Sequence, residues 1–493
     1  MATVPTPGAK SQAELQADAA IRDAYRLYAV QEFRRAKSLL DQVIAHVPRH
    51  ADAYHLRADV LSRGMLDAKA AQADLAAAEA ILGPNAETDR RRAELLLRMG
   101  DDAGAEAAAR ACLTRAPAKV EAYETLAKLS GAPLTEADQA AMLALAKDDG
   151  VAPGPRRALF NALGRLAEKR RAYDDAFAHF AASAALNTAP YDGPRAEHIA
   201  GFAAGYDEAF RAARRNWGVK DARNVFFIGM PRSGSTLIEH ALTAHPRVES
   251  GGETNAVLQI ARMLAARLTL EPKPSSASFA FLDALGKTDI RLGANRYVPL
   301  VESHFAKKNP LKVLDKSLVN FLRLPLILTM FPNAVILHTF RHPLDMAMSI
   351  FQQNFGNTAF AARLDWIGRF WRDYCAFMDL FEEVMPGRII HLGHEDFVLD
   401  FEPRCRRLTE LCGLPWDDRV ARPHENDRMI YTASAGQARR PVNTSSFGRW
   451  RNYERHLGPL IDAMGGMDAI EARHARFGAL GERHFGPPPA IAN

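Results

Sequence analysis

The pattern of apolar and polar positions divides the chain into two parts. In the first 190 residues, which are rich in alanine and leucine, apolar positions recur at helical spacing between turn residues. Helices are expected in pairs at 33–47 with 51–63 and at 93–99 with 103–115, with a last unit at 159–186. Beyond residue 222, short apolar runs alternate with longer helical segments. The pattern therefore predicts an all-α part followed by an α/β part.

The all-α part shows internal repetition. Pro48, Pro84 and Pro117 lie 36 and 33 residues apart, and Ala53-Tyr54 recurs as Ala122-Tyr123 after 69 residues. These separations match one and two units of the tetratricopeptide repeat, whose period is about 34 residues. Stacked helix pairs of this kind form a superhelix with a concave groove. We expect a tetratricopeptide-repeat domain over 1–190 and a helical linker over 191–221; an alanine-rich bundle without repeats is the alternative.

The second part, 222–493, reads as a parallel sheet covered by helices on both faces, with its ligand at the carboxyl ends of the strands. Its aromatic positions 366, 370, 371 and 377 have helical spacing and are expected in the core. The run His394-Glu395-Asp396 is interpreted as a structural element at a strand end. The expected strands are 225–228, 313–314, 335–340 and 389–392, and the expected helices are 237–244, 321–330, 344–355 and 365–384.

The segment 224–239 joins a buried strand to a helix through a glycine-bearing loop. Gly229, Gly234 and Thr236 have the spacing of a phosphate-binding loop, in which backbone N–H groups and the helix N-terminus face an anion. Ser235 stands where such loops carry the lysine that reaches a nucleoside triphosphate. Arg232 precedes it by three residues, which indicates a shorter anion with its charge placed differently. A turn that binds no ligand is the alternative.

A second anion site is predicted about a hundred residues later. The strand 335–340 ends in Arg341, where a nucleotide triphosphatase would need a carboxylate for Mg²⁺. The guanidinium is a bidentate anion ligand, so we expect an anion site without metal. Ser349, eight residues on, could contact the same anion. The alternative for Arg341 is a surface ion pair.

Taken together, the motifs of residues 222–460 resemble the sulfotransferases that use 3′-phosphoadenosine 5′-phosphosulfate (PAPS). Within them, the chain is similar to the tyrosylprotein sulfotransferases and to bacterial enzymes that join this domain to tetratricopeptide repeats. The motifs are Pro231-Arg-Ser-Gly-Ser-Thr236, Ala244-His-Pro246, Gly251-Gly-Glu-Thr254, Arg341 with Ser349, and Ser434-x-x-Gln437-x-x-x-Pro441-Val-Asn443 followed by Arg449-Trp450.

The resemblance implies roles for these residues. Arg232, Ser233, Gly234, Ser235 and Thr236 would bind the 5′-phosphosulfate of PAPS. The 3′-phosphate would be bound by Arg341 and Ser349. The residues that would close over the nucleotide are Ser434, Gln437, Asn443 and Arg449.

The resemblance also implies catalytic residues. Glu253 falls on the family's general base, which would take the proton of a hydroxyl acceptor. Lys316 would stabilise charge at the oxygen that bridges phosphate and sulfur, together with Arg232. The products are a sulfated acceptor and adenosine 3′,5′-bisphosphate, and no metal is expected. Without the resemblance, Glu253 would read as a helix cap and Lys316 as a solvated surface charge.

Two departures from the tyrosylprotein enzymes concern the acceptor. Those enzymes carry an arginine two residues after the base and another four residues after the 3′-phosphate serine. This chain has Asn255 and Gln353 there. Acidic tyrosine motifs are therefore in doubt as acceptors, and a protein tyrosine, a saccharide or a small molecule remains open.

Composition narrows the class of protein further. Of the 493 residues, 48% are hydrophobic and 25% charged, as in ordinary globular proteins of two or three domains. The net charge of +5 is mild, and no clustered basic face with stacking aromatics points to nucleic acid. Four cysteines lack metal-ligand spacing and are expected to be reduced core residues. With no leader-like or membrane-length apolar run, a cytoplasmic location without membrane contact is expected.

These observations leave three functions to compare. The first is a PAPS-dependent sulfotransferase whose repeats recruit the acceptor or a protein partner, or mediate self-association. The second is a catalytically inactive nucleotide-binding scaffold whose repeats mediate protein–protein interaction. A phosphate-loop kinase is disfavoured, because the loop lysine and the strand-end carboxylate are missing.

Overall fold

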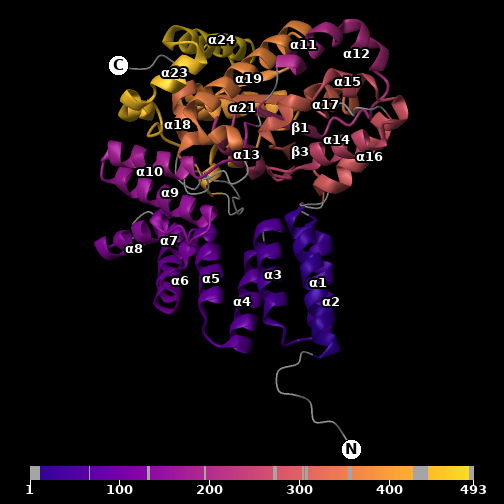
Figure 1. The fold of residues 1–493 in the computed structure, drawn as a ribbon. Coiled ribbons are helices and arrows are strands. Elements are labelled where there is room, and N and C mark those ends of the chain that lie inside the picture. The colour runs from indigo at the N-terminus through magenta and orange to yellow at the C-terminus, as the bar shows by residue number, and fades with distance from the viewer. Residues whose placement is uncertain are drawn as a thin grey trace, which may run out of the picture. The chain divides into compact units, whose positions relative to one another are not determined.

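The computed structural model contains two compact units, Met1–Val151 and Ala152–Asn493. Each unit is built from its own consecutive elements (Figure 1). The structure describes residues 11–30, 32–65, 67–129, 134–191, 193, 196–269, 275–302, 305, 309–353, 358–425 and 442–487.

The first unit is entirely helical in its described residues. Neighbouring helices pack against each other, as α1 does on α2, α3 on α4 and α5 on α6. Its alanine and leucine positions supply the contacts, since Ala36, Leu40, Ala53 and Leu56 are all buried. The helices are α1 (Gln12–Ala29), α2 (Phe33–His46), α3 (Ala51–Asp59) with a π-helical turn η1 (Val60–Gly64), α4 (Ala68–Leu82), α5 (Ala86–Met99), α6 (Asp102–Arg115), α7 (Val120–Lys128) and α8 (Glu136–Lys147). The predicted helix pairs are confirmed, while their assignment to tetratricopeptide repeats stays a prediction.

The second unit contains a five-stranded parallel sheet. The strands are β1 (Asn224–Gly229), β2 (Val248–Ser250), β3 (Lys312–Asp315), β4 (Val335–Phe340) and β5 (Ile390–Gly393). They lie in the order β2-β3-β1-β4-β5, and every pairing is parallel. The four predicted strands are confirmed. The sequence analysis missed β2, whose three residues are too short to show a period of their own.

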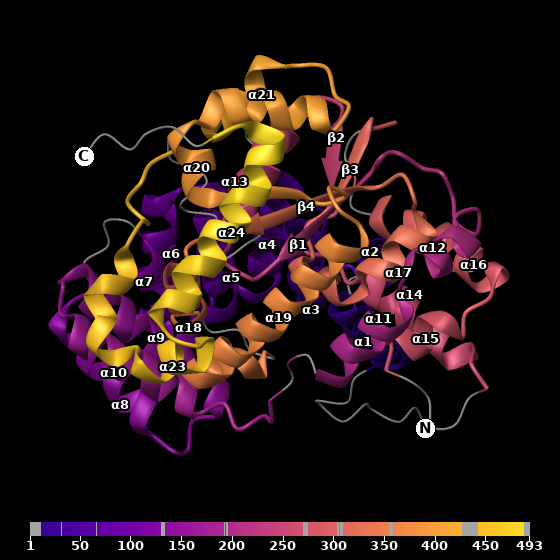
Figure 2. The same cartoon turned by 90° about the horizontal axis from the view of Figure 1, so that it is seen from above.

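Helices cover both faces of this sheet. As a result, nearly all residues of the five strands are buried. On β1, Phe226 and Ile228 pack into one core cluster with Ile260 of α14 (Ala256–Arg267) and Phe377 of α19 (Leu364–Val384). Val225 and Phe227 alternate with them and join a second cluster. That cluster includes residues of α13 (Ser235–Ala244) and α21 (Phe401–Leu411), which lie on the other side of the strands in Figure 2.

The remaining elements of the second unit frame this sheet. They are α9 (Pro153–Lys169), α10 (Tyr173–Ala185), α11 (Ala196–Gly205), α12 (Glu208–Arg214), α15 (Phe279–Asp283), α16 (Lys287–Glu302), α17 (Leu324–Met330), α18 (Pro343–Phe351), α20 (His394–Leu399), α23 (Gly458–Met464), α24 (Met467–Phe485) and the 3₁₀ segments η2 (Leu318–Arg323), η3 (Ala359–Ala362), η4 (Asp418–Ala421), η5 (Pro423–Glu425) and η6 (Arg449–His456).

Helices α9 and α10 lie in the second compact unit, although their sequences read as a last repeat. The ring of Phe177 on α10 stacks on Phe351 of α18 with centroids 5.6 Å apart. On α9, the Asn161 amide donates to the Gln352 carbonyl at 2.6 Å. The boundaries predicted at residues 190 and 221 stay predictions.

Two expectations from composition can be compared with the described residues. Cys112, Cys375, Cys405 and Cys412 are all buried and free, which confirms that they are core residues. Within the described ranges, no helix combines the length and the apolar character needed to cross a membrane.

Candidate functional site

The loop between β1 and α13 turns sharply at the carboxyl end of the sheet. Arg232 has a φ of 69° and Gly234 a φ of 90°. The left-handed conformation is costly for a residue with a side chain, and such strain gathers at functional sites. Gly234 is the N-cap of α13 and no side chain caps this helix. The N-terminus of α13 therefore has the character of an anion site.

Glycine is required in this loop by close contacts as well as by conformation. A Cβ atom on Gly234 would lie 2.4 Å from Nδ1 of His394, and one on Gly229 would lie 2.4 Å from the Thr339 carbonyl oxygen. Both positions bring the loop against residues of the β4 and β5 strand ends. The loop is thus held against the sheet edge.

Arg341 follows β4 directly and is largely buried, with a side chain only 10% exposed. Its Nη2 donates to the Ser446 carbonyl. The carboxylates of Asp345 and Glu395 lie 3.8 and 3.9 Å from the guanidinium. Burial lowers the pKa of Arg341, and these two carboxylates oppose the shift. The reading of Arg341 as an exposed surface ion-pair former is therefore wrong.

The buried Nε of Arg341 lacks a hydrogen-bond partner among the described residues. A buried donor left unpaired costs free energy. This orphaned donor, on a cation beside the loop, is the feature that best fits an anionic ligand.

Arg232 belongs to the same positive group. Its Nε donates to Oγ of Ser349 at 2.8 Å, so the predicted 5′ and 3′ anion residues contact each other. Burial and the neighbouring cations Arg165, Arg341 and Arg449 lower the pKa of Arg232 to about 10. It is still charged at neutral pH, so the group concentrates positive charge at one end of the site.

His394 lines the site from the first residue of α20. Burial, Arg341 and Arg232 lower its pKa to about 3, so the imidazole is neutral at physiological pH. Its Nε2 lies 3.5 Å from Oγ of Ser446. The sequence analysis treated His394 as purely structural; the structure places it in the wall of the site.

Glu253 and Lys316 form an ion pair where β2 and β3 end. Lys316 Nζ donates to Glu253 Oε1 at 2.6 Å. The two loops that carry them are joined by backbone bonds from Gly251 N to Leu314 O and from Lys316 N to Gly252 O, both 2.9 Å long. Helix α14 has Asn255 as its N-cap, without a side-chain cap. The reading of Glu253 as a helix cap is therefore wrong.

Lys316 is buried, with a side chain only 1% exposed, whereas Glu253 is 62% exposed. A second carboxylate, Glu239 of α13, lies 3.6 Å from Nζ. Burial alone would lower the pKa of Lys316, but Glu239 and Glu253 outweigh it and raise the pKa. Lys316 is therefore a charged, buried lysine fixed between two carboxylates, and not a solvated surface charge.

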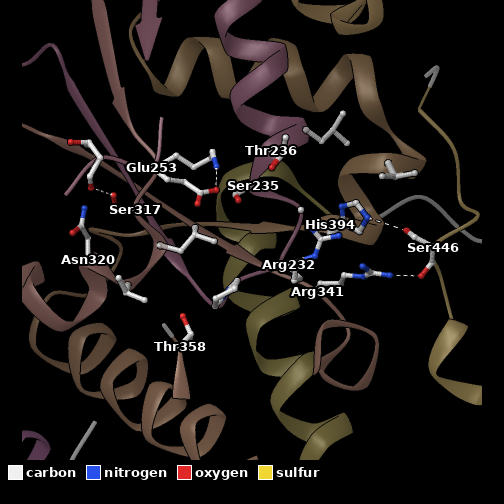
Figure 3. Close-up of a pocket in the computed structure, with 18 of the residues that line it drawn as sticks. Arg232, Ser235, Thr236, Glu253, Ser317, Asn320, Arg341, Thr358, His394 and Ser446 are labelled. Carbon is white, nitrogen blue, oxygen red and sulfur yellow. Dashed lines mark hydrogen bonds and ion pairs between the residues drawn. The ribbon is translucent and has the colours of Figure 1, made fainter. Parts of the chain in front are cut away.

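These groups line one cavity of about 690 Å³. Figure 3 shows Arg232, Arg341, His394 and Ser446 at one end and Glu253, Ser317 and Asn320 at the other. The segments that follow all five strands enter it, as expected at the carboxyl end of a parallel sheet. The predicted residues in its lining are Arg232, Gly234, Ser235, Thr236, Glu253, Lys316, Arg341, Asn443 and Arg449.

Four predicted residues are not in this lining. Ser233 is buried behind the loop, where its hydroxyl is 2.7 Å from Oγ1 of Thr339. Ser349 lies behind Arg232 as its hydrogen-bond acceptor. Ser434 and Gln437 lie outside the described residues.

Sequence reasoning missed several residues that hold or line the cavity. Glu168 of α9 forms an ion pair with Arg449 at 2.7 Å and accepts hydrogen bonds from Tyr453 and Gln352 at 2.8 and 3.0 Å. Asp345 of α18 accepts from the backbone N–H groups of Gly448 and Trp450 at 2.7 and 2.9 Å. Asp345 could have been noticed beside Arg341, but nothing local marks Glu168. The missed residues in the cavity lining include Asn320, Arg323, Thr358 and Ser446.

Comparison with known proteins identifies the domain that carries this cavity. Residues 224–418 match the model of the sulfotransferase family. The chain thus contains a sulfotransferase-family domain. The matched stretch includes the loop after β1, the Glu253–Lys316 pair and Arg341.

Relatives are similar over about half of the chain. An uncharacterized protein of Aquifex aeolicus is 37% identical over 250 residues, which cover 49% of this chain and 32% of that protein. Protein-tyrosine sulfotransferase A of Caenorhabditis elegans is 26% identical over 52% of this chain and 66% of its own length. Protein-tyrosine sulfotransferase 1 of Danio rerio is 26% identical over 55% of this chain and 75% of its length. The chain thus matches a third of the first relative and about two thirds of the second.

Two solved structures with low similarity also match. The sulfotransferase domain of the Synechococcus PCC 7002 olefin synthase is 19% identical, covers 52% of this chain and 95% of that domain, and has a TM-score of 0.35. The sulfotransferase domain from the curacin biosynthetic pathway is 17% identical over 52% of this chain and 96% of that domain, with a TM-score of 0.30.

Proposed function

We propose that the protein is a PAPS-dependent sulfotransferase that transfers a sulfuryl group to a hydroxyl acceptor. The single observation that carries the proposal is the Glu253–Lys316 ion pair of 2.6 Å in the same cavity as Arg232 and Arg341. One end of this cavity concentrates cations that suit a nucleotide with two separate anionic groups, and the other offers an exposed carboxylate. The sulfotransferase-family match over 224–418 supports the same reaction.

The residues present fit PAPS as a co-substrate. The N-terminus of α13 and Arg232 would hold the 5′-phosphosulfate, and Arg341 would hold the 3′-phosphate with Ser349 beside it. Two observations support this division: the uncapped start of α13 and the orphaned Nε of Arg341. A phosphate oxygen at that Nε would satisfy the donor and form a charge-assisted hydrogen bond. Asn443 and Arg449 would contact the nucleotide from the segment that precedes and opens η6.

The chemical step is assigned to the end of the cavity that contains Glu253 and Lys316. Glu253 takes the proton of the acceptor hydroxyl as its oxygen attacks sulfur. The new S–O bond forms as the bond between sulfur and the bridging oxygen breaks, which leaves adenosine 3′,5′-bisphosphate. Lys316 and Arg232 stabilise the negative charge that develops on that oxygen. Because Lys316 is buried and fixed by Glu239, its charge is preorganised.

The role of the helical unit is part of the proposal. A stack of helix pairs offers an extended surface, so Met1–Val151 would recruit the acceptor or a protein partner, or pair with a second copy. The related protein-tyrosine sulfotransferases make a tyrosine acceptor one candidate. Saccharides and small alcohols are the others, because Asn255 and Gln353 replace two arginines of those relatives.

The test combines cofactor binding with turnover. Wild-type protein should bind adenosine 3′,5′-bisphosphate in calorimetry and not ATP, and should transfer ³⁵S from labelled PAPS to a phenolic acceptor. Glu253→Gln should lower kcat by about 10²- to 10⁴-fold, because the amide cannot accept the proton. Its affinity for the bisphosphate should stay near the wild-type value.

Glu402→Gln is the matched control, since Glu402 is an exposed carboxylate of α21 paired with Arg406. It should leave both measurements unchanged. Bisphosphate binding without transfer to any acceptor would instead favour the nucleotide-binding scaffold. A Glu253→Gln variant with wild-type kcat would remove Glu253 as the base.

A further inference from the structure

The acceptor end of the cavity contains a cation that the proposed reaction does not use. Arg323 lines the same cavity as Glu253 and Lys316. It is the last residue of the 3₁₀ segment η2, which begins two residues after Lys316. Side chains three residues apart eclipse in a 3₁₀ helix, so Arg323 lies on the same face as Asn320. Figure 3 shows Asn320 on the side of Glu253 that faces away from Arg341 and His394.

The charge of Arg323 is not neutralised by the described part of the protein. No carboxylate there lies within ion-pair distance of its guanidinium, whose Nη2 reaches only the Ser276 hydroxyl at 3.4 Å. Its Nε is buried and has no hydrogen-bond partner among those residues. Burial and the neighbouring cation Arg262 lower the pKa of Arg323 to about 10, so it stays charged at neutral pH.

An arginine in this state is poorly explained by stability alone. Burying a cation without a partner costs free energy, and a leucine or methionine would pack there without that cost. Lys316, by contrast, is compensated by two carboxylates. The planar guanidinium is suited to bidentate contact with a carboxylate or another oxyanion.

The residues that line the cavity near Arg323 indicate the chemical character of the rest of the ligand. Leu258, Leu318 and Val319 line the same cavity as Glu253 and Arg323, and Val319 is 41% exposed. This wall suits an apolar or aromatic body. The nucleotide is not the source of the anion, because its two phosphate sites are assigned to the opposite end.

We propose that Arg323 binds an oxyanion carried by the acceptor, so that the preferred acceptor joins a hydroxyl to a carboxylate across an apolar body. This inference rests on the proposed function. Asn255 and Gln353, which replace arginines of the tyrosylprotein enzymes, therefore do not remove anion recognition from this chain; Arg323 supplies it from a different element. The carboxylate can belong to a small hydroxy acid or to an acidic side chain of a peptide.

Two matched acceptor pairs distinguish these sources. The first is 4-hydroxyphenylacetate with its neutral amide, 4-hydroxyphenylacetamide. The second is a tyrosine peptide flanked by aspartate and glutamate with the same peptide flanked by asparagine and glutamine. The full-length wild-type protein should prefer the anionic member of one pair by about 10- to 100-fold in kcat/KM. This factor corresponds to the free energy of a hydrogen bond to a charged group. The pair that shows the preference identifies the source.

Arg323→Gln should bring the ratio of the two kcat/KM values close to one. Arg323→Lys should give a ratio between that of Arg323→Gln and that of the wild type, because lysine keeps the charge but lacks the bidentate donors of the guanidinium. Arg406→Gln, at an exposed arginine of α21, is the matched control and should keep the wild-type ratio. A wild-type ratio near one for both pairs, or an Arg323→Gln ratio equal to the wild-type one, would overturn the assignment.

Inhibition of the wild-type protein gives a second test, which does not depend on whether the variants fold. Phenylacetate, which lacks the hydroxyl, should inhibit competitively against the acceptor and not against PAPS, and phenylacetamide should inhibit at least about 10-fold more weakly. Equal inhibition by both would contradict the role of Arg323. If no acceptor is sulfated, calorimetry can still compare the two compounds: tighter binding of phenylacetate than of phenylacetamide, by at least about 10-fold, would contradict the proposed function alone.

Discussion

At the scale of single residues, the site contains a lysine paired with carboxylates and an arginine that keeps an unpaired donor. Lys316 is fixed by Glu239 and Glu253, whereas Arg341 keeps an orphaned Nε. A preorganised charge needs no reorganisation during reaction, while an unpaired donor favours binding of an anion. The two ends of the cavity are therefore built for different tasks.

His394 gives a pH prediction. Its pKa is about 3 in the folded protein, while an unfolded histidine titrates near its ordinary value of 6.5. As the pH falls below 6.5, the unfolded chain binds a proton that the folded chain does not, so the unfolding free energy decreases. The loss approaches about 1.4 kcal/mol per pH unit and continues down to the folded pKa.

Urea unfolding of the wild type and of His394→Gln at pH 7, 6 and 5 measures this contribution. The unfolding free energy of the wild type relative to the variant should fall by roughly 1 kcal/mol between pH 6 and pH 5. Saturating adenosine 3′,5′-bisphosphate should weaken the dependence, because its phosphates would offset Arg341 and Arg232. Parallel pH profiles for the two proteins would show that His394 titrates normally.

At the scale of elements, α18 connects the two sides of the anion site. Its first turn follows Arg341, and its Asp345 carboxylate accepts the backbone N–H groups of Gly448 and Trp450 at the start of η6. This contact fixes the residue between them, Arg449. The position of Arg449 therefore depends on a carboxylate a hundred residues earlier in the chain.

Asp345→Ala tests this connection. Two N–H groups, one buried and one partly buried, would lose their acceptor, so the unfolding free energy should fall by about 1 to 3 kcal/mol, and the Kd for adenosine 3′,5′-bisphosphate should rise. Asp345→Asn keeps one acceptor oxygen and should lie between the alanine variant and the wild type. Asp365→Ala, at an exposed carboxylate paired with Arg363, is the control and should change neither quantity. Wild-type affinity in Asp345→Ala would show that η6 holds its position without α18.

The sequence predicted the elements that have their own periodicity and motifs. Strands β1, β3, β4 and β5 were recognised because continuous apolar runs mark buried parallel strands. Arg341 was found because it follows such a strand, whereas Glu253 and Lys316 were found through the resemblance to the sulfotransferases. The contributions of Glu168 and Arg323 could not be predicted: each is an ordinary charged residue in its local sequence, and only tertiary packing brings it to the cavity.

At the scale of the whole molecule, the second compact unit begins before the predicted boundary. Unit 2 starts at Ala152, so α9 and α10 share it with the sheet. Arg165 of α9 donates to the Gln353 side chain at 3.0 Å, and Glu168 holds Arg449 at 2.7 Å. A sequence that reads as a final repeat thus supplies part of the frame of the proposed nucleotide site.

The last prediction compares two truncations that differ only in these helices. Removing residues 1–151 should leave the affinity for adenosine 3′,5′-bisphosphate near the full-length value, because every described residue assigned to the nucleotide lies in unit 2. Removing 1–190 should weaken binding by at least about 10-fold, since Arg449 loses a charge-assisted bond and Phe351 loses its stacking partner. In the full-length chain, Glu168→Gln removes the ion pair with Arg449 but keeps both helices. This variant therefore measures the contribution of the ion pair alone.

The same proteins test what the first unit contributes. If Met1–Val151 recruits the acceptor, the shorter truncation should raise the acceptor KM while kcat and nucleotide affinity stay constant, because the residues proposed to be catalytic are untouched. If it pairs with a second copy, light scattering should show a lower oligomeric state. Unchanged acceptor KM and oligomeric state would refute both roles. Equal bisphosphate affinity in the two truncations would show that α9 and α10 are dispensable for the site, and that the functional boundary lies near residue 190 after all.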